Sequence, residues 1–275
     1  MNCSIWEKPG SIAEAFWKNG RADFPIYDMH GHMGSHYAIY FKRCDAPEMA
    51  AHLRRIGVRR LVFSHHHVLW GDLRNAAAVE IARQYPDLFR VYVAINPHRQ
   101  DYIREDLAQF DKWAPFAVGL KFLASYHGVK ITDKRYEYAL SFANERGLLT
   151  LHHTWGGEIC CGGEVMLEVA QKYPHAIFLM GHSIHGDWEY ARRVVTETSG
   201  NTYLELTAIP GENGIIEQLV EAVGSDRILF GTDMPWFDEY QAVGGVLSAK
   251  ISEDDMRNIL YRNAQKLLGE EEQPL

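Results

Sequence analysis

The sequence predicts an α/β protein with the fold of a (β/α)8 barrel, and three observations lead to this prediction. Short runs rich in Val, Leu, Ile and Phe alternate with segments of helical periodicity along the whole chain, which is typical of parallel βα units. The length of 275 residues suits one barrel, since such barrels commonly have about 250 residues. The alternative, an open doubly wound sheet, usually has a Gly-rich phosphate turn after its first strand. This chain has His-Gly-His there instead.

The expected elements follow one another without a linker, so we expect a single domain over residues 1–275. A short amphipathic helix from Ser11 to Asn19, closed by Gly20, is expected to pack on the barrel before the first strand, which begins with the apolar run 24–27 and carries Asp28, His30 and His32. Further strands are expected at 60–64, 90–95, 117–123, 148–152, 176–180, 202–206 and 227–230. Helices are expected at 46–56, 74–84, 102–111, 133–145, 163–172, 187–196, 214–223 and 252–268.

Local signals set the ends of these elements. Gly57 and Gly147 follow helical segments at the position where a left-handed residue ends a helix, and Pro86 stops a third helix. Ser252, with Asp255 three positions on, comes close to a capping box at the start of the last helix.

Composition excludes several classes of protein. A formal net charge of −8 argues against a nucleic-acid-binding protein, which would carry a basic face. No apolar stretch approaches the roughly 18 residues needed to span a bilayer, and the N-terminus lacks a basic start followed by an apolar block. We therefore expect a cytoplasmic protein with no membrane partner. Four cysteines without C-x-x-C spacing are expected to be free thiols.

Polar residues gather where the predicted strands end. Asp28, His30 and His32 alternate along the first strand and are expected on one face, where two imidazoles could hold one ion such as zinc. Barrel active sites lie at the C-terminal ends of the strands. The other strand ends carry Lys121, His152, His153, His182 and Asp233. The sequence therefore predicts that these side chains converge on one rim.

Several motifs resemble the amidohydrolase superfamily, and within it the amidohydrolase-related branch that includes metal-dependent hydrolases and aminocarboxymuconate-semialdehyde-type decarboxylases. The resemblance extends from Ile26 to Gly269. Its motifs are Asp28-Met29-His30-Gly31-His32, Val118-Gly119-Leu120-Lys121-Phe122, Leu151-His152-His153-Thr154-Trp155-Gly156, Met180-Gly181-His182 and Ile228-Leu229-Phe230-Gly231-Thr232-Asp233-Met234-Pro235-Trp236. Together they are specific for the superfamily, but none is specific for a substrate.

The resemblance implies a divalent metal bound by His30, His32, Asp233 and a histidine of the fifth strand. His153 is the expected ligand there, while the adjacent His152 is expected to face the helical layer. The resemblance also implies one metal per chain, with zinc expected and manganese or iron as alternatives.

The resemblance also assigns roles around the metal. His182 is expected to be a catalytic or supporting residue. Lys121 is expected near the substrate, or carbamylated between two metals as in binuclear relatives.

The implied chemistry is hydrolysis of a small organic ester, lactone or amide by a metal-bound hydroxide, because a metal can lower the pKa of its bound water to about 7. Asp233 would move the proton, His182 would stabilise negative charge, and Asp28 would hold an imidazole. The alternative is non-oxidative decarboxylation. A metal-binding barrel without activity is a third hypothesis. Trp155 and Trp236 are expected to wall the pocket, as is Phe237, and a homodimer is plausible.

Overall fold

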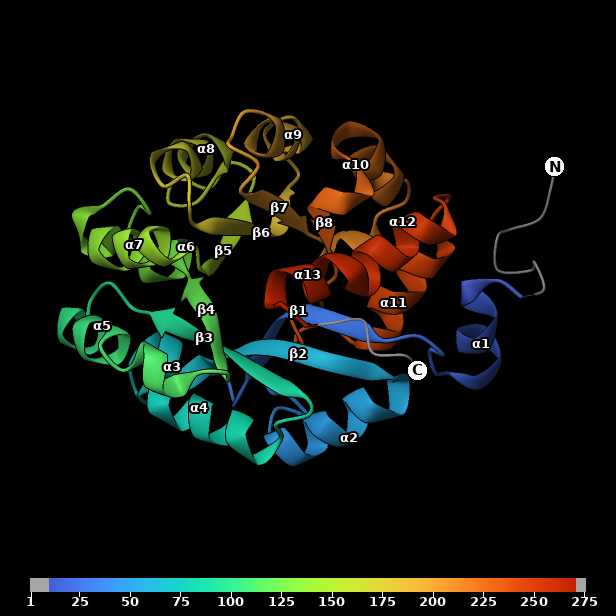
Figure 1. The fold of residues 1–275 in the computed structure, drawn as a ribbon, viewed down its shortest axis with the longest axis horizontal. Helices are drawn as coiled ribbons and strands as arrows, with labels where there is room; N and C mark the ends of the chain where they lie inside the picture. Colours follow the sequence, from blue (N-terminus) through green and yellow to red (C-terminus); the bar gives the residue numbers. More distant parts are fainter. Residues whose placement is uncertain (1–9, 271–275) are drawn as a thin grey trace.

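Eight parallel strands form one sheet in the order β1 to β8, as predicted, in the computed structural model, which describes residues 10–270. The ring of strands is surrounded by helices (Figure 1). A backbone hydrogen bond of 3.0 Å from Met29 N–H to Phe230 O joins the first strand to the end of the last one and closes the sheet into a barrel. The strands are β1 (Ile26–Met33), β2 (Val58–His65), β3 (Phe89–Ile95), β4 (Ala117–Phe122), β5 (Leu149–Trp155), β6 (Ile177–His185), β7 (Thr202–Glu205) and β8 (Ile228–Leu229).

Helices connect successive strands and cover the outside of the sheet. The main ones are α1 (Ile12–Asn19), α2 (Ala46–Ile56), α4 (Asn75–Gln84), α5 (Gln100–Leu107), α7 (Lys134–Arg146), α8 (Gly163–Lys172), α9 (Trp188–Thr196) and α10 (Ile215–Val223). Short helices α3 (His66–Trp70) and α6 (Ala124–His127) follow β2 and β4, and α11 (Glu239–Ser248) follows β8. These three were not predicted: α3 and α6, with five and four residues, are too short to show helical periodicity, and α11 contains Gly244 and Gly245, which disfavour a helix.

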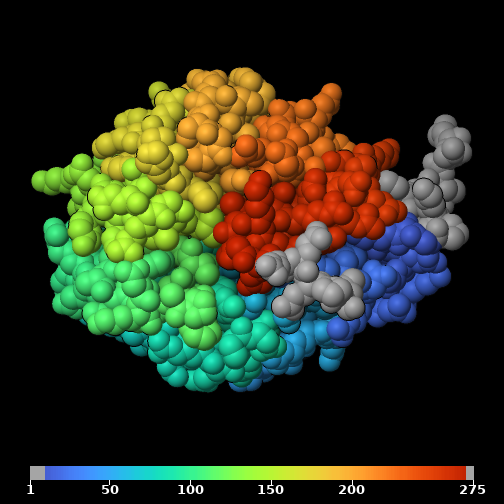
Figure 2. Space-filling model, in the orientation of Figure 1, coloured from blue at the N-terminus to red at the C-terminus, as the bar shows by residue number. Residues whose placement is uncertain are grey.

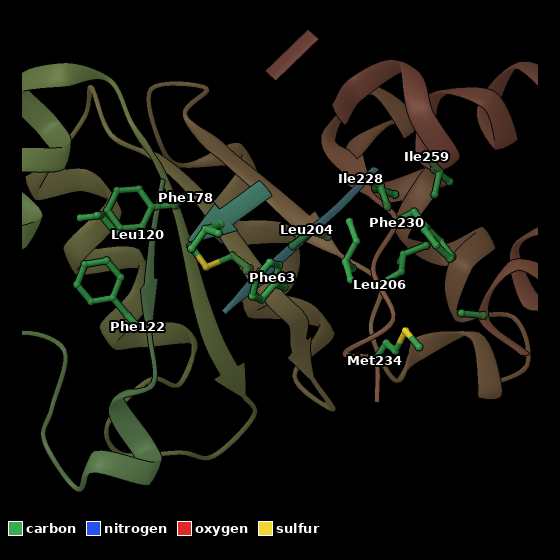
Figure 3. Close-up of a cluster of buried hydrophobic side chains, with 14 of the residues drawn as sticks. Phe63, Leu120, Phe122, Phe178, Leu204, Leu206, Ile228, Phe230, Met234 and Ile259 are labelled. Carbon is green, nitrogen blue, oxygen red and sulfur yellow. The ribbon is translucent and has the colours of Figure 1, made fainter. Parts of the chain in front are cut away.

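Two layers of apolar side chains hold the barrel together. The interior is filled by a cluster that includes Tyr27, Tyr92, Leu151 and Leu229. The outer layer lies between strands and helices. It includes Phe63, Leu120, Phe122, Phe178, Leu204, Leu206, Ile228, Phe230, Met234 and Ile259 (Figure 3). All of these are essentially excluded from water, so their burial is the main force that closes the barrel.

The C-terminal segment closes the barrel at the N-terminal ends of its strands, on the side opposite the predicted site. Ala264 of α13 (Asn263–Leu268) belongs to the interior cluster, and Leu267 packs against it. Figure 2 shows this segment lying over the centre of one face of the molecule. The predicted helix over 252–268 is divided into α12 (Glu253–Arg257), one π-helical stretch (Asn258–Arg262) and α13. The predicted capping box of Ser252 and Asp255 is present.

The N-terminal helix packs on the outside of the barrel. Phe16 of α1 lies 5.9 Å from Tyr240 of α11, measured between ring centroids, and Trp17 lies over Gly244. Helix α1 therefore supports α11 from the side (Figure 1).

Two predictions from composition can be compared with the structure. No helix within residues 10–270 is long and apolar enough to cross a membrane. Cys44, Cys160 and Cys161 are free, as expected, whereas Cys3 lies outside the described residues.

Candidate metal centre

The first strand contains an irregularity that corrects one prediction. Asp28 pairs with Leu61 and Gly31 pairs with Phe63, so β1 advances three residues where β2 advances two. Such a β-bulge changes which face a side chain points to. Asp28 consequently does not share a face with His30 and His32. Its carboxylate accepts hydrogen bonds from Thr232 Oγ1 at 2.5 Å and from the backbone N–H of His30 at 3.0 Å.

Three side chains from opposite ends of the chain meet at one point. Oδ1 of Asp233 lies 3.2 Å from Nε2 of His30 and 3.0 Å from Nε2 of His32. All three residues are buried, and no hydrogen bond satisfies Asp233 Oδ1. Atoms bound to the same zinc or magnesium-sized ion lie about 3.0 to 3.4 Å apart. The spacing and the unsatisfied oxygen fit a shared metal ion.

The other ring nitrogens of these histidines explain why a cation suits this point. Nδ1 of His30 lies 2.7 Å from Oε2 of Glu205, and Nδ1 of His32 lies 3.0 Å from Ser64 Oγ. If each Nδ1 carries the proton and donates it to that oxygen, both Nε2 atoms present lone pairs. Two lone pairs and a carboxylate oxygen then face one another, an arrangement that a cation stabilises.

Glu205 is the functional residue that the sequence analysis missed. It is fully buried at the end of β7. Its oxygens accept hydrogen bonds from His30 Nδ1, the N–H of His182, and both the N–H and the hydroxyl of Thr207. This, rather than Asp28, is the carboxylate that holds an imidazole. The available signal was a charged residue between Leu204 and Leu206 at the end of a predicted strand.

Lys121 also reaches this centre. Its side chain is fully buried, and Nζ lies 2.8 Å from Nε2 of His30, whose lone pair would be taken up by the metal when one is bound. Burial lowers the pKa of Lys121 to about 8, because a low-dielectric surrounding disfavours the ammonium form. Lys121 can therefore take up or release a proton near neutral pH.

The two histidines of β5 face opposite sides, as predicted. The ring of His152 is stacked between Phe122 and Phe178 in the outer layer, at centroid distances of 4.6 and 5.1 Å. His153 faces the cavity, where its Nδ1 lies 3.0 Å from Nε2 of His182. His153 is not a member of the group of three ligand atoms within 4.8 Å of one another. Its role as a fourth ligand stays a prediction.

The segment that carries His182 has an unusual backbone. His182, Ser183 and Ile184 have φ values of 65°, 51° and 55°, and Asp233 has 59°. Left-handed conformations of non-glycine residues cost about 1 to 3 kcal/mol each and cluster at functional sites. Hydrogen bonds hold the run in place, because Ser183 Oγ donates to Glu205 O at 2.8 Å and Ile184 N–H donates to Thr154 Oγ1 at 2.9 Å.

The imidazoles at this rim are held in their neutral form. Burial lowers the pKa of His30 and of His153 to about 3. Burial also holds the pKa of His32 and that of His182 well below the usual range. A neutral imidazole has a free lone pair, so these side chains are suited to bind a metal or to accept a proton.

A cavity of about 170 Å³ opens next to this cluster. Its walls are mostly aromatic and include three residues predicted to form them. The lining residues are His32, His36, His66, Leu69, Trp70, Leu123, Tyr126, His153, Trp155, His182, Ala208, Asp233, Trp236 and Phe237. His32, His153, His182 and Asp233 thus share one cavity, as predicted, whereas His36, Trp70 and Tyr126 come from loops and short helices that the sequence analysis did not assign.

Fold and site together define an α/β barrel with a candidate metal centre at the C-terminal ends of its strands. Residues 27–269 match the family described as Amidohydrolase. The chain therefore belongs to the amidohydrolase family, as the motifs indicated. A comparison with curated proteins found no match.

Solved structures with the same fold are distant in sequence. An uncharacterised TIM-barrel protein from Bordetella bronchiseptica has a TM-score of 0.74 at 17% identity, with 90% of this chain and 99% of that chain covered. The 5-carboxyvanillate decarboxylase from Novosphingobium aromaticivorans, complexed with manganese and a nitrobenzoic acid, has a TM-score of 0.71 at 12% identity, covering 90% and 96%. A dihydroxybenzoic acid decarboxylase from Polaromonas, with manganese and 2-nitroresorcinol, has a TM-score of 0.69 at 16% identity, covering 89% and 97%.

Proposed function

We propose that the protein is a metal-dependent decarboxylase that removes CO₂ from a small aromatic carboxylic acid. The observation that carries this proposal is the cavity, in which aromatic walls stand directly over the ligand cluster of His30, His32 and Asp233. The solved decarboxylases with the same fold support it. The proposal reverses the order of the sequence analysis, which put hydrolysis first and decarboxylation second.

The size and lining of the cavity suit one aromatic ring. A cavity of roughly 150 Å³ lined by apolar side chains can hold benzene, and this one has about 170 Å³. Trp155 and Trp236 offer flat surfaces on which a ring can stack. Among the described residues that line the cavity, none is Arg or Lys, so a substrate carboxylate would have to be oriented at the metal centre and its imidazoles.

The charge balance favours decarboxylation over hydrolysis. A carboxylate loses hydration when it enters an apolar cavity, which is costly. Loss of CO₂ removes that charged group, so the apolar walls disfavour the substrate carboxylate relative to the product, while a metal that holds the carboxylate would offset part of this effect. Hydrolysis of an ester or amide gains no such advantage, because it creates a carboxylate instead.

His30, His32 and Asp233 would hold the metal, with His153 as the predicted fourth ligand. When bound, a divalent metal would supply a Lewis acid that orients and polarises substrate oxygens. Manganese is present in two of the compared decarboxylases, so we propose manganese or zinc here.

The protein's own residues handle the proton. Breaking the bond between the ring and the carboxylate leaves an electron pair on the ring carbon, and one proton must be delivered there. Asp233 and His182 both line the cavity, and Nδ1 of His182 is buried without a hydrogen-bond partner. Asp233 would deliver the proton, because burial raises the pKa of its carboxyl group and so favours the form that carries one. A proton from solvent would then restore it, while the neutral His182 and its hydrogen bond to His153 complete the polar side of the cavity.

The test is a substrate panel assayed with protein loaded with manganese or zinc. Hydroxylated benzoic acids are monitored for CO₂ release and for the decarboxylated ring by chromatography, and lactones and esters are monitored for acid release. The proposal predicts CO₂ release that is abolished in Asp233→Asn. Turnover of lactones or esters without any CO₂ release would instead favour the hydrolase that the family description suggests.

A further inference from the structure

A second group of potential ligands lies outside the cavity, where α2 meets the start of α11. Nε2 of His52 is 3.2 Å from Oδ2 of Asp238 and 3.0 Å from Oε2 of Glu239. The side chains of His52 and Glu239 are 7% and 0% exposed. We propose that His52, Asp238 and Glu239 form a second binding site for a divalent metal of the zinc type, which joins α2 to α11.

The buried atoms of this group lack hydrogen-bond partners. Oε1 of Glu239 has no hydrogen-bond partner among the described residues, and Oε2 faces only Nε2 of His52, with which it forms an ion pair when the imidazole is protonated. A buried carboxylate without partners is costly. The distances of 3.0 and 3.2 Å match those between His30, His32 and Asp233 at the first centre. A shared ion would satisfy all of these atoms at once.

The kind of ligand set indicates the kind of ion. One imidazole nitrogen and two carboxylate oxygens suit zinc and similar divalent metals. Asp238 is 40% exposed on its side chain, so an ion can enter from solvent and keep water at its remaining position. His52 lies on α2, Glu239 begins α11 and Asp238 caps that helix, so both helices contribute ligands.

Asp238, unlike Glu239, already has partners on its exposed side. Arg43 donates to Oδ2 of Asp238 at 3.0 Å, and Oδ1 accepts the N–H of Tyr240 as the helix cap. The pair of Arg43 and Asp238 is about 40% exposed on each side, so solvent screens it.

A metal bound at this second site would also stabilise part of the cavity wall. Asp238 directly follows Trp236 and Phe237, which line the cavity. A metal bound by Asp238 and Glu239 would fix the end of the loop between β8 and α11. The site would therefore hold two aromatic walls in place without touching the substrate.

Metal counting on the full-length protein tests the proposal. The protein is stripped with a chelator and dialysed against Zn²⁺, and zinc per folded chain is measured by mass spectrometry. Wild type is expected to bind two ions. A double variant with His32→Ala and Asp233→Asn, which lacks the first centre, is expected to bind one. Adding Glu239→Gln to that double variant is expected to remove this ion.

Controls separate this site from adventitious binding. His67→Ala, placed in the double variant, removes a more exposed histidine that lies 3.5 Å from Asp72 and is expected to leave the ion bound. His52→Asn gives a second test of the site if Glu239→Gln does not fold. The proposal is overturned if the double variant binds no zinc, or if its zinc survives the change at Glu239 or at His52. His52 and Glu239 would then be only an ion pair between helices.

Discussion

Replacing Glu205 with Gln should weaken metal binding at the first centre although residue 205 touches no metal. The carboxylate accepts from Nδ1 of His30 at 2.7 Å in a fully buried position. It thereby fixes the imidazole orientation that turns Nε2 toward Asp233, and its charge makes that nitrogen a stronger donor to a metal. Glu205→Gln keeps the shape of the side chain and removes the charge.

The size of the effect can be worked out from the four hydrogen bonds of Glu205. Loss of a residue that orients a ligand typically costs 10- to 100-fold in metal affinity, which is about 1.4 to 2.7 kcal/mol. The four donors to Glu205 come from His30, His182 and Thr207. The amide of Gln has only one acceptor oxygen, so about two of these donors would face an NH₂ group instead. Each unsatisfied donor costs about 1 to 3 kcal/mol of folding free energy.

The assay is a competition titration of Zn²⁺ between the protein and a chelating dye, together with urea unfolding of the metal-free protein. Thr207→Val is the matched control, because it removes one donor to the same carboxylate and keeps the charge. Its effect on affinity should be smaller than that of Glu205→Gln. Unchanged zinc affinity in Glu205→Gln would refute the role of Glu205 in orienting His30.

Three further predictions concern stability and activity. Burial lowers the pKa of His152 to about 3 from an unfolded value near 6.5, so the folded state disfavours the proton and stability falls as pH drops below 6.5. At pH 5 this lowers the free energy of unfolding by about 2 kcal/mol relative to neutral pH. Urea unfolding of the metal-free protein should therefore show a smaller decrease between pH 7 and pH 5 in His152→Phe than in wild type. Equal decreases would contradict the explanation. Gly231→Ala should reduce the free energy of unfolding by about 1 to 3 kcal/mol and so lower the melting temperature, because the Cβ of the new Ala side chain would clash with Oε1 of Glu205. An unchanged melting temperature would show that the site can relax. Lys121→Met should keep one metal at the first centre, because Lys121 is not among the three grouped ligands. It should reduce CO₂ release about 10- to 100-fold, because Nζ contacts the metal-binding His30; loss of the metal would instead indicate that a carbamylated Lys121 is a ligand.

The sequence was sufficient to predict the barrel and the convergence of its strand ends. Alternating apolar strands and helices specify where each strand ends, and in a barrel all those ends share one rim. That is why His30, His32 and Asp233 could be predicted to meet although they are about two hundred residues apart. His153 rather than His152 faces the cavity, as strand alternation requires of adjacent residues, but the expectation that His153 binds the metal stays a prediction.

Features that depend on tertiary contacts could not be predicted from the sequence. The bulge in β1 turns Asp28 away from the imidazoles, and no local pattern at Met29 announces it. Glu205 carries the role expected of Asp28, since β8, which separates β7 from β1, is only two residues long and Glu205 at the end of β7 reaches His30 past it. The left-handed conformation of Ile184 is contrary to the preference of a β-branched residue and is imposed by the surrounding hydrogen bonds.

The central claim is that His30, His32 and Asp233 hold one catalytic metal. A crystal structure of the protein grown with Mn²⁺ or Zn²⁺, with anomalous data collected at the metal edge, tests it most directly. If these three side chains bind the metal, we expect a strong anomalous peak within about 2.0 to 2.3 Å of Nε2 of His30, Nε2 of His32 and an oxygen of Asp233. A fully loaded protein whose only peaks lie away from these three side chains would contradict it.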